Sequence, residues 1–169
     1  MIAFALLLAA MVSDDTEPKI DAPILTLRIA EALVSKRMAV RIGIRPVTEP
    51  VQEVTADRIQ FVANYEDRGR ISRRWTDGAK CPGAMNVLLE VERLTMPSPR
   101  LPLVTRSMQG GYIVMDGTSY DLEVASSSLQ QQDTGPIHIS SNVGTDLAKW
   151  ADALSAALEN CWVPARSWP

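Results

Sequence analysis

The chain has 169 residues and a formal net charge of -3, and 46% of its residues are hydrophobic while 22% are charged. This composition excludes an intrinsically disordered protein, a collagen-like repeat and a multi-spanning membrane protein. We expect a single domain, because a domain of about 150 residues buries about 68–70% of its unfolded surface. The net charge is too small to identify a partner.

The first stretch of the sequence has the profile of a signal peptide. Residues 2–12 form an uncharged apolar run that ends at Ser13. A helix needs roughly 20 residues to cross a bilayer, so we expect no stable membrane span. The sequence predicts a signal peptide at residues 1–13, a flexible linker at 14–22, a domain at 23–165, and a periplasmic or secreted location. The alternative is that the apolar run forms a helix buried in the domain.

The next segment carries two conflicting patterns. Apolar residues alternate with polar ones, as in a strand, at Leu25, Leu27 and Ile29. Residues 30–34 are typical of a helix instead. We expect a helix over residues 23–36, with Asp21 as its N-cap and Pro23 in its first turn.

The middle of the chain predicts a strand, a hairpin and a helix. Residues 40–44 alternate between apolar and polar and indicate a half-buried strand. Residues 56–76 form a hairpin candidate, with its turn at residues 67–69. Pro82 then stands at the favoured first position of a helix, whose apolar residues recur at three- and four-residue spacing up to Leu94.

The last part of the chain predicts a second hairpin, a strand and a helix. A second hairpin is expected at residues 112–125, around the turn dipeptide Asp116-Gly117. A short strand at residues 137–139 and a helix at about 145–160 follow. The pattern predicts an α+β fold. It would be a mostly antiparallel sheet built from two hairpins plus extra strands, with two antiparallel helices packed on one face.

The two cysteines fit an oxidising compartment. Cys81 and Cys161 are the only cysteines, and their spacing suits no metal site. In an exported chain such a pair predicts one disulfide. Here it would join the start of the helix expected from Pro82 to the end of the helix expected at about 145–160. The alternative is two free, buried thiols in a cytosolic protein.

Charge is distributed unevenly along the chain. Residues 28–80 hold eleven basic and seven acidic residues, whereas residues 107–160 hold one basic and seven acidic residues. The guanidinium fork of arginine suits carboxylates and phosphates. We therefore expect an anionic envelope component or an acidic protein to bind a basic face, whose candidate residues are Arg41, Arg45, Arg68, Arg70, Arg73 and Arg74. The alternatives are a solvated face whose basic strands pair with the acidic segment of the same molecule, or a compositional preference for arginine.

Common catalytic signatures are absent from the sequence. It contains no G-x-S-x-G, G-x-G-x-x-G or phosphate-binding loop, and a single histidine excludes H-E-x-x-H zinc chemistry. We expect no catalytic residue, metal, cofactor or nucleic-acid partner, and favour an exported, non-catalytic binding domain. The alternative is a small periplasmic hydrolase that uses His138 with Ser140 and either Asp121 or Asp133. The competing interpretation of His138 is an exposed side chain on a sheet face.

Overall fold

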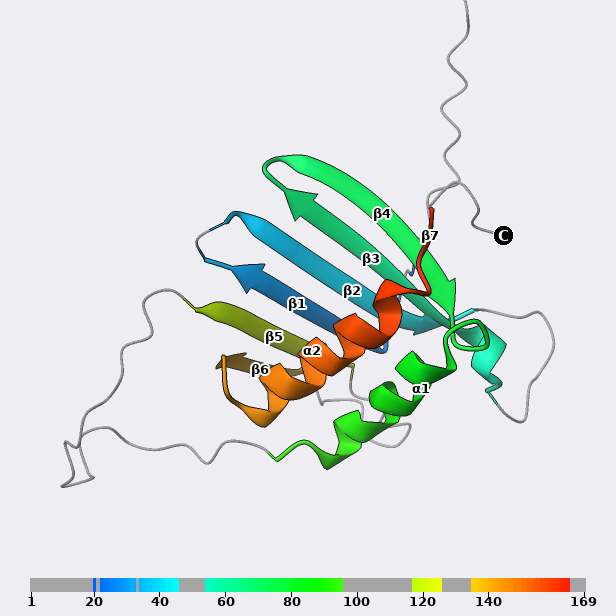
Figure 1. Cartoon of the computed structure of the whole chain (residues 1–169). Coiled ribbons are helices and arrows are strands. Elements are labelled where there is room, and N and C mark those ends of the chain that lie inside the picture. The colour runs from blue at the N-terminus through cyan, green and yellow to red at the C-terminus, as the bar shows by residue number, and fades with distance from the viewer. Residues whose placement is uncertain are drawn as a thin grey trace, which may run out of the picture.

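One antiparallel sheet forms most of the structure (Figure 1). The computed structural model describes residues 20, 22–32, 34–45, 54–95, 117–125 and 135–164. The strands are β1 (Leu25–Glu31), β2 (Lys36–Ile44), β3 (Ile59–Asp67), β4 (Arg70–Asp77), β5 (Thr118–Val124), β6 (Ile137–Asn142) and β7 (Val163–Pro164). Their order across the seven-stranded sheet is β6-β5-β1-β2-β3-β4-β7, and every neighbouring pair is antiparallel. The predicted α+β class with an antiparallel sheet is confirmed.

The helix expected at residues 23–36 is wrong. This segment forms β1 and the turn into β2, and Ser35 takes a positive φ of 51° in that turn. The alternating pattern prevails because β1 lies between β2 and β5, where Leu25 and Leu27 are buried and Arg28 points to the other face. A central strand gains backbone pairing on both sides, which outweighs the helix preference of a few neighbouring residues.

The next two strands form a tight hairpin. β3 and β4 pair over their full lengths, and Arg68 and Gly69 connect them with φ angles of 51° and 77°. Two consecutive positive φ angles are typical of a two-residue turn that matches the twist of the strands. The strand expected at residues 112–115 lies outside the described residues, and β5, its expected hairpin partner, pairs instead with β1 on one edge and β6 on the other.

Two α-helices cover one face of the sheet (Figure 1). They are α1 (Pro82–Leu89) and α2 (Asp146–Glu159), with short 3-10 helices η1 (Ala56–Arg58) and η2 (Glu90–Arg93). Thr145 is the N-cap of α2, and its hydroxyl oxygen accepts a hydrogen bond from the Ala148 N–H at 3.1 Å. α2 buries a stripe at three- and four-residue spacing, formed by Leu147, Trp150, Ala151, Leu154 and Leu158.

The core lies between the helices and this face of the sheet, which we call the helix face. Large apolar side chains that are almost completely buried come from four strands of the sheet: Leu27, Val40, Ile42, Phe61 and Leu122. The helices contact each other as well, because the Trp150 indole N–H donates to the Val87 carbonyl at 2.8 Å. In the described part of the chain, no helix is long and apolar enough to cross a membrane.

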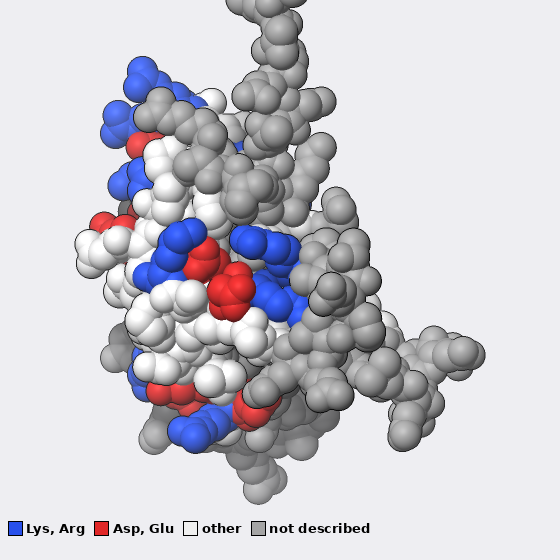
Figure 2. Space-filling view, turned by 90° about the vertical axis from the view of Figure 1, so that its right-hand side faces the viewer, with Lys and Arg blue, Asp and Glu red and all other residues white. Residues whose placement is uncertain are grey.

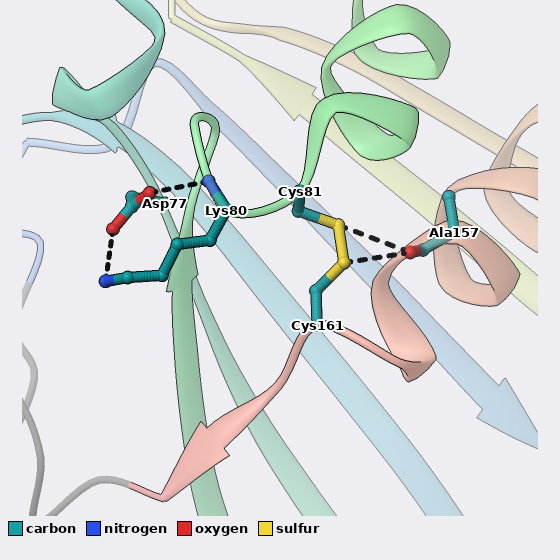
Figure 3. Close-up of a disulfide and its surroundings, with 5 residues drawn as sticks. All are labelled: Asp77, Lys80, Cys81, Ala157 and Cys161. Atoms are coloured by element: carbon teal, nitrogen blue, oxygen red, sulfur yellow. Dashed lines mark hydrogen bonds and ion pairs between the residues drawn. A yellow bond between two sulfur atoms is a disulfide. The ribbon is translucent and has the colours of Figure 1, made fainter.

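The predicted disulfide is confirmed. Cys81 immediately precedes α1, Cys161 follows α2, and their Cα atoms are 5.7 Å apart with the sulfurs bonded. The carbonyl oxygen of Ala157 lies 3.3 Å from the sulfur of Cys81 and 3.4 Å from that of Cys161 (Figure 3). The bridge therefore joins the start of one helix to the end of the other.

Candidate binding surfaces

The sheet surface turned away from the helices, which we call the opposite face, carries two of the six candidate arginines. Strand register places Arg41 beside Val62, and Arg73 beside Asn64, on this face. Arg74 follows Arg73 in β4 and therefore lies on the helix face, where its guanidinium is 5.2 Å from the centre of the Tyr65 ring. The structure thus separates two arginines that are adjacent in the sequence.

The remaining candidate arginines lie at the two ends of the strands. Arg68 occupies the β3–β4 turn and Arg70 begins β4, and both are exposed. Arg45 lies at the other end of the sheet, directly after β2. The six residues therefore occupy several surfaces, and they do not form one continuous patch.

Arg41 has unusually small neighbours. Its register partner on β1 is Thr26. On β2, Ala39 and Gly43 are the residues before and after Arg41 on the same face. A side chain at position 43 would collide with Ile20, so glycine is needed for this close approach. Arg41 is exposed, and none of the ion pairs among the described residues includes it. Its guanidinium is available to a ligand.

A compact charged cluster occupies the sheet end where Arg45 lies. With the Gln60 side-chain amide turned so that its oxygen faces Arg45, that oxygen accepts from Nε and Nη2 of Arg45 at 2.7 and 3.0 Å. Nη2 of Arg58 donates to the Arg45 carbonyl at 3.1 Å. Arg45 therefore supports the local structure, and its guanidinium is already engaged.

Asp77 and Lys80 form the most buried ion pair of this cluster (Figure 3). Asp77 is only 6% exposed, and its carboxylate accepts from the Lys80 ammonium at 2.7 Å and the Lys80 backbone N–H at 2.9 Å. Burial alone would raise the pKa of Asp77, but the Lys80 hydrogen bonds and the charges of Lys80 and Arg45 together lower it. Figure 2 shows that Lys or Arg side chains lie next to Asp or Glu side chains on one side of the molecule.

His138 and Ser140 lie on the opposite face of β6, but their contacts differ. Nδ1 of His138 is 4.0 Å from Glu123, which also pairs with Arg28 at 3.4 Å. The Ser140 hydroxyl donates to the Asp121 carboxylate.

These contacts assemble no Ser-His relay. No hydrogen bond joins His138 to Ser140 among the described residues, and the His138 side chain is 62% exposed. A general base must lie within hydrogen-bond reach of the proton that it removes. The geometry therefore gives the hydrolase alternative no support. Asp133, its other candidate acid, lies outside the described residues.

Sequence reasoning missed a groove of about 500 Å³ on the helix face, between α2 and the neighbouring ends of β1, β2 and β3. Its apolar lining comes from Ile29, Met38 and Tyr65, while Asp152 and Glu159 line it from α2. We call this feature the acidic groove. A partial signal was present in the sequence, because residues 152, 155 and 159 recur at helical spacing on one polar stripe.

The described residues include no group of three His, Cys, Asp or Glu side chains arranged to hold a metal ion. Comparison with known proteins gave no match: no protein-family model, curated protein or solved structure matches this chain.

Proposed function

We propose that this protein is an exported, non-catalytic domain of the periplasm or extracellular space that binds an acidic polysaccharide of the cell envelope. The ligand would contact the opposite face around Arg41. The observation that supports this proposal is an exposed guanidinium with small neighbours and no ion pair among the described residues. On β2 the side chain next to this guanidinium on one side is that of Ala39, so a sugar chain can approach from there, while Ile20 fills the space over Gly43 on the other side.

The chemistry of arginine favours this ligand class. A planar guanidinium can donate two parallel hydrogen bonds to one carboxylate. Arg73 lies on the same face as Arg41, one strand beyond β3, so a polymer that crosses the strands could reach both. Repeated carboxylates along a sugar chain would match this separation better than a single small anion.

The disulfide supports the proposed location. Disulfides persist in oxidising compartments such as the periplasm and the extracellular space, and they are rare in the cytosol. The apolar run at residues 2–12 agrees with export. Mass spectrometry of the protein recovered from a periplasmic extract tests this part. We expect a mature chain that starts near residue 14 and lacks the two thiol hydrogens; an intact, reduced chain in the cytosol would contradict it.

Binding to polygalacturonate, a carboxylated polysaccharide, tests the ligand proposal. We expect Arg41→Gln to weaken binding about five- to tenfold, as for the loss of one charge-assisted contact. Raising the salt from about 0.05 M to about 0.5 M should also weaken it, because salt screens exposed charges.

Arg74→Gln is the matched control. It removes the same charge from a neighbouring part of the sheet, but on the helix face. It should leave polygalacturonate affinity unchanged. Equal loss in both variants would show that net charge alone attracts the polymer. Salt-independent binding, no binding, or binding of an acidic protein in place of the polysaccharide would overturn the proposal.

A further inference from the structure

The acidic groove on the helix face has an apolar floor and charged walls. We propose that it binds a small organic polycation of the polyamine class, in which ammonium groups are separated by methylene chains. This site lies on the side of the sheet opposite Arg41 and takes a ligand of opposite charge. It is therefore independent of the function proposed above.

One wall of the groove follows from the strand register. Glu31, Lys36 and Asp67 stand in one row across β1, β2 and β3. This row is two residues beyond the row formed by Ile29, Met38 and Tyr65, so both rows lie on the helix face. The sheet thus contributes two carboxylates and one ammonium to the groove.

The other wall comes from α2. Asp152, Ser155 and Glu159 line the groove and follow one stripe of the helix. The residues that line the groove on the helix face therefore include four carboxylates and one cation, Lys36, while the Arg74 guanidinium lies beside Tyr65 outside this lining. Arg37 and Glu66 also border it, but they are register partners on the opposite face and offset each other. The excess negative charge favours a ligand with more than one positive charge.

The floor distinguishes a polyamine from a metal ion. Ile29 and Met38 offer no oxygen atoms to a hard cation, which prefers a shell of oxygen ligands. They offer apolar surface on which a methylene chain would be removed from water. The volume of about 500 Å³ also falls within the range of small-molecule sites.

Two wall residues are fixed by neighbouring groups before any ligand arrives. The Tyr120 hydroxyl donates to Asp152 at 2.9 Å, which orients that carboxylate and leaves its second oxygen available. Tyr65 is held between the Arg74 guanidinium and the edge of the Trp162 ring. Burial raises the pKa of the Tyr65 hydroxyl, the charge of Arg74 opposes this shift, and the more weakly acting charge of Glu159 adds to it.

Isothermal titration with spermidine tests the proposal on the full domain. We expect one binding site, about tenfold weaker binding in Glu159→Gln, and little change in Glu92→Gln. Glu92 is the matched control because it is equally exposed and loses the same charge, but lies in η2 away from the groove. Circular dichroism should show the same fold in both variants.

Further probes separate the possible outcomes. Arg41→Gln should bind spermidine with the affinity of the unmodified protein. The two binding proposals can therefore fail separately, because each has its own variant and its own ligand. Magnesium ions should not compete at equal concentration, since they cannot use the apolar floor. The proposal is overturned by absence of spermidine binding, by equal losses in Glu159→Gln and Glu92→Gln, or by preference for magnesium. It is also overturned if a lysine-rich peptide binds the groove while spermidine does not.

Discussion

The disulfide should contribute a large part of the stability of this protein. The bridge closes a loop with a sequence separation of 80 residues. For a loop of this length the chain-entropy relation gives an unfolded-state entropy loss equivalent to about 4.5 kcal/mol at room temperature. Native domains of this size have unfolding free energies of only about 5–15 kcal/mol. We therefore expect the double variant Cys81→Ala/Cys161→Ala to lose between a third and nearly all of its stability.

Urea denaturation followed by tryptophan fluorescence measures this loss. The variant should unfold at a much lower urea concentration, and its thermal midpoint should fall by roughly 9–18 °C. Wild-type protein treated with a reductant is the control, because it breaks the bridge and keeps both sulfur atoms in the core. The two samples should unfold at similar urea concentrations. A loss below about 1 kcal/mol in both would refute the entropic reasoning and would indicate an already restricted unfolded chain.

Three further predictions concern the core, a helix cap and an ion pair. Leu154 is fully buried on α2, so Leu154→Ala should lower the unfolding free energy by about 2–5 kcal/mol in urea titrations. Thr145→Ala should cost about 1 kcal/mol in the same assay, because it removes the acceptor for the Ala148 N–H, whereas Thr145→Ser should retain most of the stability. The pKa of Asp77 is lowered by folding, so its contribution should be present above its unfolded value of 3.8 and be lost as the pH falls below it. Urea titrations at about pH 7 and about pH 3 measure this contribution. The unfolding free energy of Asp77→Asn should fall less between these two pH values than that of the wild type; an equal fall would show that Asp77 does not contribute.

Much of the fold could be predicted because strong local patterns agreed with their tertiary surroundings. The helix expected at about 145–160 depends on local features, and the structure forms it as α2 over Asp146–Glu159. The turn at Arg68 and Gly69 is set by two adjacent residues. The segment after Pro23 was mispredicted because the deciding contribution is non-local: β1 gains its second neighbour, β5, from a distant part of the sequence.

The binding surfaces could be predicted less well. A strand period of two assigns Arg73 and Arg74 to different faces, but only the pairing with β3 shows which one faces the helices. Arg45 was a reasonable candidate by composition, yet Gln60 engages it at the sheet end. The acidic groove depends on the register of three strands and on the placement of α2 above them. Neither the strand register nor the position of α2 can be predicted from any short segment.

The sheet order has a consequence for how this chain can be made. The first four strands form a continuous meander whose outer strands are β1 and β4; β5 later covers β1 along its whole length, and β7 covers β4 at Arg74 and Trp75. Until the second half emerges, the meander would therefore present two unpaired strand edges, which are sites for pairing with other chains. A fragment that stops after α1 should aggregate, whereas in the full-length chain β5 covers the edge of β1 and β7 covers part of the edge of β4. Export as an unfolded chain, followed by folding after both halves have arrived, would avoid this exposed intermediate.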